Sequence, residues 1–256
     1  MVAFKSAVKN ALLFGSSVIH RNHKSKVLFY HDVYKSVNYK ALDDDLYMGT
    51  PLNLFQEHVA VIRKEGYRIV PHISSPDGEV VIMFDDGFRG IWECREFFYE
   101  QQICPTICLP VDYIGRKEEG ILTIEEIREL QQHGFLFTCH GWSHEDLTQF
   151  ADEDLKRELG ESKAELERLL GKSVDGLCLP LGLFSDHLLD EIRKYGYEAI
   201  YSCIPGNYDY LPHGILRTRN LCQFASPLEV RLILRGGNEV LKGRYERMHH
   251  KSQEVG

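Results

Sequence analysis

Short apolar runs alternate with amphipathic helical patterns through most of this 256-residue chain, and this alternation constrains the fold more than any other feature. Apolar runs bounded by turn residues indicate buried strands, and apolar residues spaced three and four apart indicate helices. The expected strands are residues 27–30, 67–70, 80–84, 105–110, 135–138, 176–179 and 199–203. The expected helices are residues 53–66, 91–101, 123–133, 152–170 and 186–195. Strands that alternate with helices over about 180 residues predict a mainly parallel sheet, either open or closed into a barrel.

Composition excludes several classes of protein. The net charge of −8 argues against binding to nucleic acid, because phosphates attract lysine and arginine. No apolar stretch approaches the roughly 18 to 20 residues that span a bilayer. Seven cysteines without any CxxC pair suit a reducing compartment better than a disulfide framework. We therefore expect a cytoplasmic protein.

The ends of the chain differ from its centre. Residues 1–25 contain Lys5 and Lys9 before an apolar stretch, which is compatible with a signal peptide, an interfacial anchor or a simple helix. Glycine and serine interrupt that stretch and no cleavage site follows, so an N-terminal helix or tail is favoured. Residues 26–225 are expected to form the main domain. Residues 226–256 form a helical, basic tail that is either disordered or in contact with a partner or with the periphery of a membrane.

Two adjacent acids follow a buried strand in the segment VVIMFDDGF, residues 80–88. In parallel sheets the reactive groups collect at the carboxyl ends of the strands. A turn at Gly87 would bring Asp85 and Asp86 toward one cavity, and two ionised carboxylates there call for a cation. The alternative is an ordinary turn in which Asp86 caps the next helix.

A pair of histidines follows another expected strand. His140 and His144 stand four residues apart in the segment TCHGWSH, residues 138–144. This spacing places both imidazoles on one side of a turn. Two imidazoles and one carboxylate, with a position left for water, form a catalytic site for one divalent metal ion. One aspartate would bind the metal while the other takes a proton from water. The same donors suit zinc, cobalt, nickel or iron, so the residues alone leave the identity of the metal open.

At these residues the sequence resembles the polysaccharide deacetylase family, the NodB-homology domains of carbohydrate esterase family 4. Residues 83–87 (MFDDG) are similar to its first motif, TFDDG, and residues 140–144 (HGWSH) to its second, HxxxH. Residues 178–182 (CLPLG) stand where the third motif reads RxPYG. The opening stretch 27–33 (VLFYHDV) resembles the extracellular-polysaccharide branch. The likeness covers roughly residues 26 to 222.

The resemblance implies a distorted (β/α) barrel that removes N-acetyl groups from an acetylated sugar. It implies that Asp85 is the general base and that Asp86, His140 and His144 hold zinc or a similar ion. The backbone N–H of Leu181, next to Pro180 in the substrate pocket, would stabilise the oxyanion. The late motif L-x-H, whose histidine protonates the leaving amine, is matched by residues 211–213, which makes His213 the candidate acid.

Some features depart from the family pattern or stay open. Cys178 replaces the arginine that usually orients the base, so that guanidinium is expected to be missing. His213 lies in a turn-like stretch and is otherwise a plain loop residue. His31 either lines the pocket or belongs to a turn, and Trp142 either stacks on a sugar ring or packs its own loop. The charged helical segment 153–168 is expected to be a solvated face.

Three functions fit these observations. The first is a metal-dependent N-deacetylase acting on an N-acetylated saccharide in a polysaccharide or glycolipid precursor. The second is a carbohydrate-binding or scaffold protein that has kept the fold and lost turnover. The third is a metal amidohydrolase that acts on a non-sugar amide.

Overall fold

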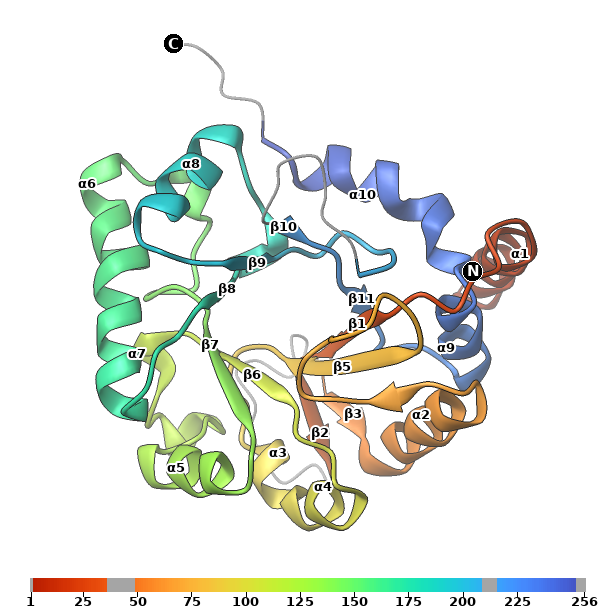
Figure 1. The fold of residues 1–256 in the computed structure, drawn as a ribbon, viewed down its shortest axis with the longest axis horizontal. Coiled ribbons are helices and arrows are strands. Elements are labelled where there is room, and N and C mark those ends of the chain that lie inside the picture. Colours follow the sequence, from red (N-terminus) through yellow and green to blue (C-terminus); the bar gives the residue numbers. More distant parts are fainter. Residues whose placement is uncertain (1, 36–48, 209–215, 252–256) are drawn as a thin grey trace.

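The computed structural model describes residues 2–35, 49–208 and 216–251. Within them, parallel strands curl into a half-barrel in the order β10-β9-β8-β7-β6-β5-β1-β11, and β4 pairs with β5 off this path (Figure 1). A separate two-stranded sheet joins β2 (Asp32–Tyr34) to β3 (Gly49–Pro51). The strands of the half-barrel are β1 (Lys26–Tyr30), β4 (Arg68–Ile69), β5 (Glu79–Phe84), β6 (Thr106–Leu109), β7 (Leu136–Cys139), β8 (Gly176–Cys178), β9 (Ala199–Tyr201), β10 (Leu216–Arg217) and β11 (Asn220–Leu221). The mainly parallel sheet expected from the alternation is confirmed.

Helices surround the curled sheet on its outer side (Figure 1). They are α1 (Val2–Ile19), α2 (Leu52–Lys64), α3 (Gly90–Glu93), α4 (Arg95–Gln101), α5 (Ile124–Gln132), α6 (Asp152–Leu155), α7 (Ser162–Leu170), α8 (Asp186–Lys194), α9 (Pro227–Leu234) and α10 (Lys242–His249). Thr123 and Glu126 form the reciprocal hydrogen bonds of a capping box at the start of α5. None of the described helices combines the length and hydropathy needed to cross a membrane.

Two expected helices are interrupted. The segment 91–101 is divided between α3 and α4, because Cys94 adopts φ −95° and ψ 5°, while its buried thiol donates to the carbonyl of Val33. The segment 152–170 contains a π-helical stretch, η4 (Lys156–Glu161), between α6 and α7. Such π-helical insertions are often found at functional sites.

The central strands are buried on both faces, which explains their unbroken apolar sequences. Side chains of β1 and β5 alternate between two clusters. Leu28 and Ile82 pack between the sheet and the outer helices, whereas Phe29 and Met83 belong to a smaller cluster on the opposite face. Burial of each such side chain stabilises the fold by roughly 1.5 to 3 kcal/mol.

The strand register brings several strand ends to one level. Tyr30 at the end of β1 pairs with Phe84 at the end of β5, and Leu109 at the end of β6 pairs with Cys139 at the end of β7. The N–H of Asp85 then donates to the carbonyl of Tyr30 at 2.9 Å. The residues that follow these strands therefore gather at the same edge of the half-barrel.

Candidate metal centre and active site

The turn after β5 directs the paired aspartates into one site. Asp86 and Gly87 both adopt left-handed backbone conformations, with φ of 68° and 70°. A Cβ atom on Gly87 would lie 2.6 Å from Cδ2 of Leu109, so only glycine fits there without a shift of its neighbours. Asp85 and Asp86 are both buried, with 3% and 6% of their surfaces exposed. The expected turn at Gly87 is confirmed, and the alternative in which Asp86 caps the next helix is wrong, because the N-cap of α3 is Arg89.

Asp86 lies between the two histidines of the segment 140–144. Its Oδ1 is 3.4 Å from Nε2 of His140 and 3.1 Å from Nε2 of His144. His140 is buried, and His144 reaches the site because its backbone is left-handed, with φ of 64°. Carboxylate and imidazole donors that lie within 4.8 Å of one another can hold a single cation. The structure thus brings together the three expected ligands, and their binding of a metal stays a prediction.

Hydrogen bonding around these ligands supports a cation at this position. Nδ1 of His140 donates to the carbonyl of Cys178 at 2.8 Å, which directs Nε2 of the same ring at Asp86. In neutral His140 that Nε2 is an acceptor, so two acceptors face each other unless a positive charge lies between them. Among the described residues, Oδ1 of Asp86 has no hydrogen bond of acceptable geometry. The donor set and the orphaned oxygen therefore fit a divalent ion.

The pKa of Asp86 also suits a ligand of a divalent ion. Burial by itself would raise the pKa of Asp86, because it penalises the charged carboxylate. The imidazoles of His140 and His144 outweigh that effect and hold the pKa of Asp86 far below its usual value. Asp86 is consequently ionised at neutral pH.

Asp85 is held by an arginine rather than by the histidines. Nη1 and Nη2 of Arg219 donate to Oδ1 and Oδ2 of Asp85 at 2.7 and 2.9 Å, in a bidentate pair. Arg219 is completely buried, its Nε donates to the carbonyl of Ser202, and its guanidinium lies 4.1 Å from the centre of the Phe29 ring. Burial would raise the pKa of Asp85, but the charge of Arg219 lowers it to about 2.

This pair corrects one expectation from the sequence. The guanidinium expected to be missing is present, because Arg219, between β10 and β11, supplies it from another part of the chain. Cys178, at the position of the usual arginine, is buried beside the same carboxylate, with its thiol 3.7 Å from Oδ1 of Asp85. In the sequence, the one available signal for Arg219 is the polar stretch that follows the short segment 216–217.

A second residue was misjudged from the sequence. Glu158 belongs to the segment expected to be a solvated face, yet it is buried, with 3% of its surface exposed. Its Oε2 accepts hydrogen bonds from the N–H groups of Trp142 and Ser143 at 2.8 and 3.1 Å. It therefore fixes the loop between His140 and His144. Glu158 lies within the π-helical stretch η4.

The remaining expected site residues have different surroundings. His31 does reach the site edge: its Nε2 is 4.0 Å from Oδ2 of Asp86, and its Nδ1 is hydrogen-bonded to Oε1 of Gln223. The Trp142 ring lies 4.7 Å beneath the guanidinium of Arg157, a contact that packs the loop, so stacking on a sugar stays a prediction. His213 lies outside the described residues, and its role as the acid stays a prediction.

The backbone around Leu181 is also unusual. Leu181 lies in the short helix η5 (Pro180–Gly182) with φ of 57°, and 54% of its surface is exposed. Its N–H meets no acceptor among the described residues. Left-handed backbone at a residue other than glycine is strained and is often found at functional sites. In this structure Asp86, His144 and Leu181 all show it.

Comparisons with known proteins agree with this geometry. Residues 72–200 match a family model described as polysaccharide deacetylase. A putative polysaccharide deacetylase of Bacillus subtilis, YxkH, is 23% identical over 194 residues, an alignment that covers 72% of this chain and 66% of that relative. A peptidoglycan-N-acetylmuramic acid deacetylase of the same organism, PdaA, is 30% identical over 77 residues, 29% of each chain.

Solved structures show the same fold. The deacetylase PplD of Streptococcus pyogenes superposes with a TM-score of 0.71 at 17% identity, over 82% of this chain and 98% of that one. The polysaccharide deacetylase BC0361 of Bacillus cereus gives a TM-score of 0.70 at 21% identity, over 82% of this chain and 69% of that one. These likenesses confirm the distorted (β/α) barrel expected from the sequence.

Proposed function

This chain belongs to the polysaccharide deacetylase family, and on this premise we propose that it is a metal-dependent hydrolase that removes N-acetyl groups from an acetylated saccharide. Membership of the family indicates an enzyme of the carbohydrate N-deacetylase class, as the sequence predicts. The observation that carries the proposal is the cluster of buried Asp86 and His140 with partly buried His144, beside the ion pair of Asp85 and Arg219.

The three ligands suit one divalent ion, and zinc is proposed because imidazole and carboxylate donors with an open position are typical of catalytic zinc. Asp86, His140 and His144 would hold it. When bound, such an ion supplies Lewis acidity toward water and toward the carbonyl of the acetyl group. The hydrogen bond from His140 to the carbonyl of Cys178 fixes the ring for this role.

Asp85 is proposed to take the proton of the attacking water. A carboxylate has about four lone-pair positions, so the two hydrogen bonds from Arg219 leave acceptor capacity on each oxygen. With its pKa lowered to about 2, Asp85 is ionised at neutral pH and ready to accept a proton. Arg219 thereby lowers the basicity of Asp85, fixes the position of its carboxylate and keeps it ionised.

Two further steps need a donor each. The free N–H of Leu181 is proposed to donate to the oxyanion that forms on the acetyl carbonyl. The leaving amine needs a proton, for which His213 is the candidate from the sequence and His31, at the edge of the site, is a candidate from the structure. A general acid of either kind would act within hydrogen-bonding reach of the amine.

The substrate is proposed to be an N-acetylated sugar within a surface polysaccharide or a glycolipid precursor. The names of the relatives support this class, since PdaA acts on peptidoglycan N-acetylmuramic acid and YxkH is a putative polysaccharide deacetylase. A non-sugar amide and a binding-only role are the alternatives to be tested.

The test combines metal analysis with acetate release. We expect about one divalent ion per chain in the wild type and acetate release from N-acetylglucosamine oligomers or peptidoglycan fragments. Asp86→Ala and His144→Ala should lose both properties. His187→Ala is the matched control, because His187 lies in a second, more exposed cluster with Asp152 and Glu191 and should lose neither.

Each alternative has its own outcome. Full acetate release and metal content in Asp86→Ala would refute the proposed centre. Saccharide binding without acetate release in the metal-loaded wild type would favour the binding-only role. Hydrolysis of simple acetanilides but of no acetylated saccharide would favour the non-sugar amidohydrolase.

A further inference from the structure

Helix α1 has apolar side chains on two opposite faces. Its inner face packs on α9 and on the short helix η6 (Gly237–Leu241), with Leu13 fully buried. Its outer face carries four apolar side chains that are 52 to 79% exposed: Leu12, Phe14, Val18 and Ile19. A helix at a protein surface ordinarily places polar residues on its outer face. The outer face of α1 therefore resembles a surface that is covered by another apolar medium.

The apolar surface continues from α1 onto α10. The two helices lie beside each other at one edge of the half-barrel (Figure 1). A groove of about 290 Å³ between them is lined by side chains that include Leu12, Leu241, Tyr245 and Met248. Met248 is 53% exposed and Val240, just before α10, is 49% exposed. Scattered exposed apolar residues are ordinary, whereas a contiguous set on two adjacent helices marks a site of interaction.

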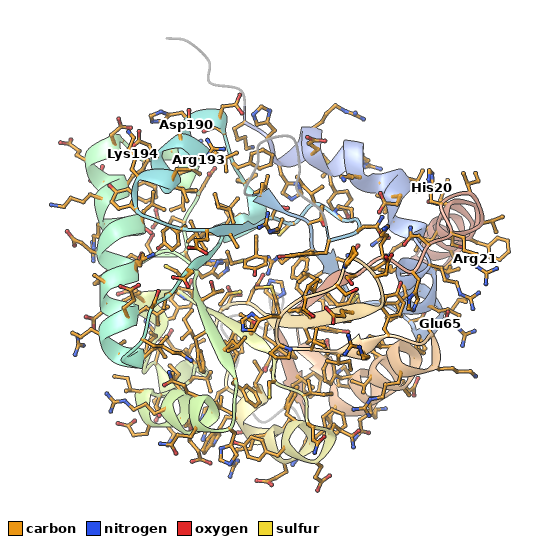
Figure 2. The ribbon with its side chains drawn as sticks, viewed as in Figure 1. His20, Arg21, Glu65, Asp190, Arg193 and Lys194 are labelled. Carbon is orange, nitrogen blue, oxygen red and sulfur yellow. The ribbon has the colours of Figure 1, made fainter. Side chains whose placement is uncertain are left out.

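The two segments that form this surface are basic, and of their cations Lys9 pairs with Glu229 and Lys24 pairs with Asp77. Residues 2–24 contain four lysines and arginines and no acid, and residues 240–251 contain four lysines and arginines and one acid. These two segments together carry +7, so the rest of a chain of net charge −8 carries −15. Arg21, Arg244 and Arg247 are exposed at the border of the apolar surface. Figure 2 shows Arg21 beside His20 at this edge, far from the labelled residues of α8.

We propose that the surface formed by α1 and α10 binds peripherally to an anionic lipid bilayer. Apolar side chains would enter the interface between headgroups and acyl chains, and the arginines would contact lipid phosphates. α1 would lie in the plane of the membrane, since no described helix is able to cross it. A symmetric contact with a second copy is disfavoured because it would bring two basic rims together. This proposal does not depend on the proposed enzymatic activity.

Sedimentation of the full chain with vesicles tests the proposal. We expect at least about tenfold more protein on vesicles of phosphatidylcholine with phosphatidylglycerol than on phosphatidylcholine alone, and release at high salt. The double variant Phe14→Ser/Val18→Ser and the double variant Arg244→Glu/Arg247→Glu should each reduce binding about tenfold or more. Unchanged thermal unfolding would show that both variants are folded.

The matched control reverses two positive charges elsewhere. Arg193→Glu/Lys194→Glu reverses two exposed charges on α8, at another edge of the molecule, and should bind as the wild type does (Figure 2). If the control lost as much vesicle binding as Arg244→Glu/Arg247→Glu, the loss would follow from net charge alone, and the proposal would be overturned. Absence of wild-type binding would also overturn it. So would a wild-type dimer in light scattering that becomes a monomer on Phe14→Ser/Val18→Ser, because a second copy would then cover the surface.

Discussion

Replacement of Arg219 by methionine is the most informative perturbation of the site. Methionine keeps much of the length of the side chain and removes the guanidinium. Asp85 would stay buried without its partner, and breaking a buried pair in this way costs about 3 to 5 kcal/mol of folding free energy. The carbonyl of Ser202 would also lose the hydrogen bond from Nε of Arg219.

The pH dependence gives an independent measure of the same pair. The pKa of Asp85 is lowered from 3.8 to about 2, which corresponds to about 2 kcal/mol of stability near neutral pH. This contribution is present above pH 3.8 and is lost as the pH falls toward 2. Without Arg219, burial dominates and raises the pKa of Asp85, so the deficit of Arg219→Met should be largest near neutral pH and should shrink on acidification.

The assay is urea unfolding of three variants near neutral pH and at about pH 4. Arg219→Met should be the least stable, and Asp85→Asn/Arg219→Met should recover part of the loss because no charge is then buried alone. Arg168→Met, which breaks the exposed pair with Glu165, should unfold close to the wild type. A loss below about 1 kcal/mol in Arg219→Met, or a double variant no more stable than the single, would refute the reasoning.

Activity should respond in the same direction. In Arg219→Met the acid limb of the profile of kcat/KM against pH should move to higher pH, because the raised pKa of Asp85 leaves less of the base ionised. Arg219→Lys should shift it less, since a lysine keeps the charge and loses the bidentate geometry. An unchanged acid limb in both variants would separate Arg219 from the ionisation of the base.

Three further predictions concern the turns around the site. Gly87→Ala should cost about 1 to 3 kcal/mol in urea unfolding, because its φ of 70° and the contact with Leu109 both oppose a Cβ atom; wild-type stability would contradict the strain argument. Glu158→Ala leaves two N–H groups of the histidine loop unpaired and should weaken metal binding about 10- to 100-fold in chelator competition; unchanged affinity would make Glu158 irrelevant to the centre. Leu181→Gly should keep acetate release and slightly stabilise the fold, because glycine accepts φ of 57° and retains the N–H; a large loss of activity would show that the leucine side chain is needed.

The sequence by itself determined the architecture and the local motifs. Alternating apolar runs and helical periodicities are properties of single elements, so they predicted the parallel sheet and the helix of residues 123–133, which is α5 in the structure. The position of Asp85 and Asp86 at the end of a buried strand, and the spacing of His140 and His144, also lie within short segments. Four site residues could therefore be proposed before any contact was known.

Only the tertiary structure decided what surrounds those residues. Arg219 pairs with Asp85 across 134 positions of sequence, and their contact depends on the curled sheet that brings the segment between β10 and β11 beside the ends of β1 and β5. The sequence predicts that Glu158 is a surface acid. In the structure it is buried and accepts a hydrogen bond from the N–H of Trp142, because the π-helical stretch η4 packs against the loop between His140 and His144. Burial and charge pairing depend on which residues are neighbours in space, and the periodicity of a single helix or strand does not specify those neighbours.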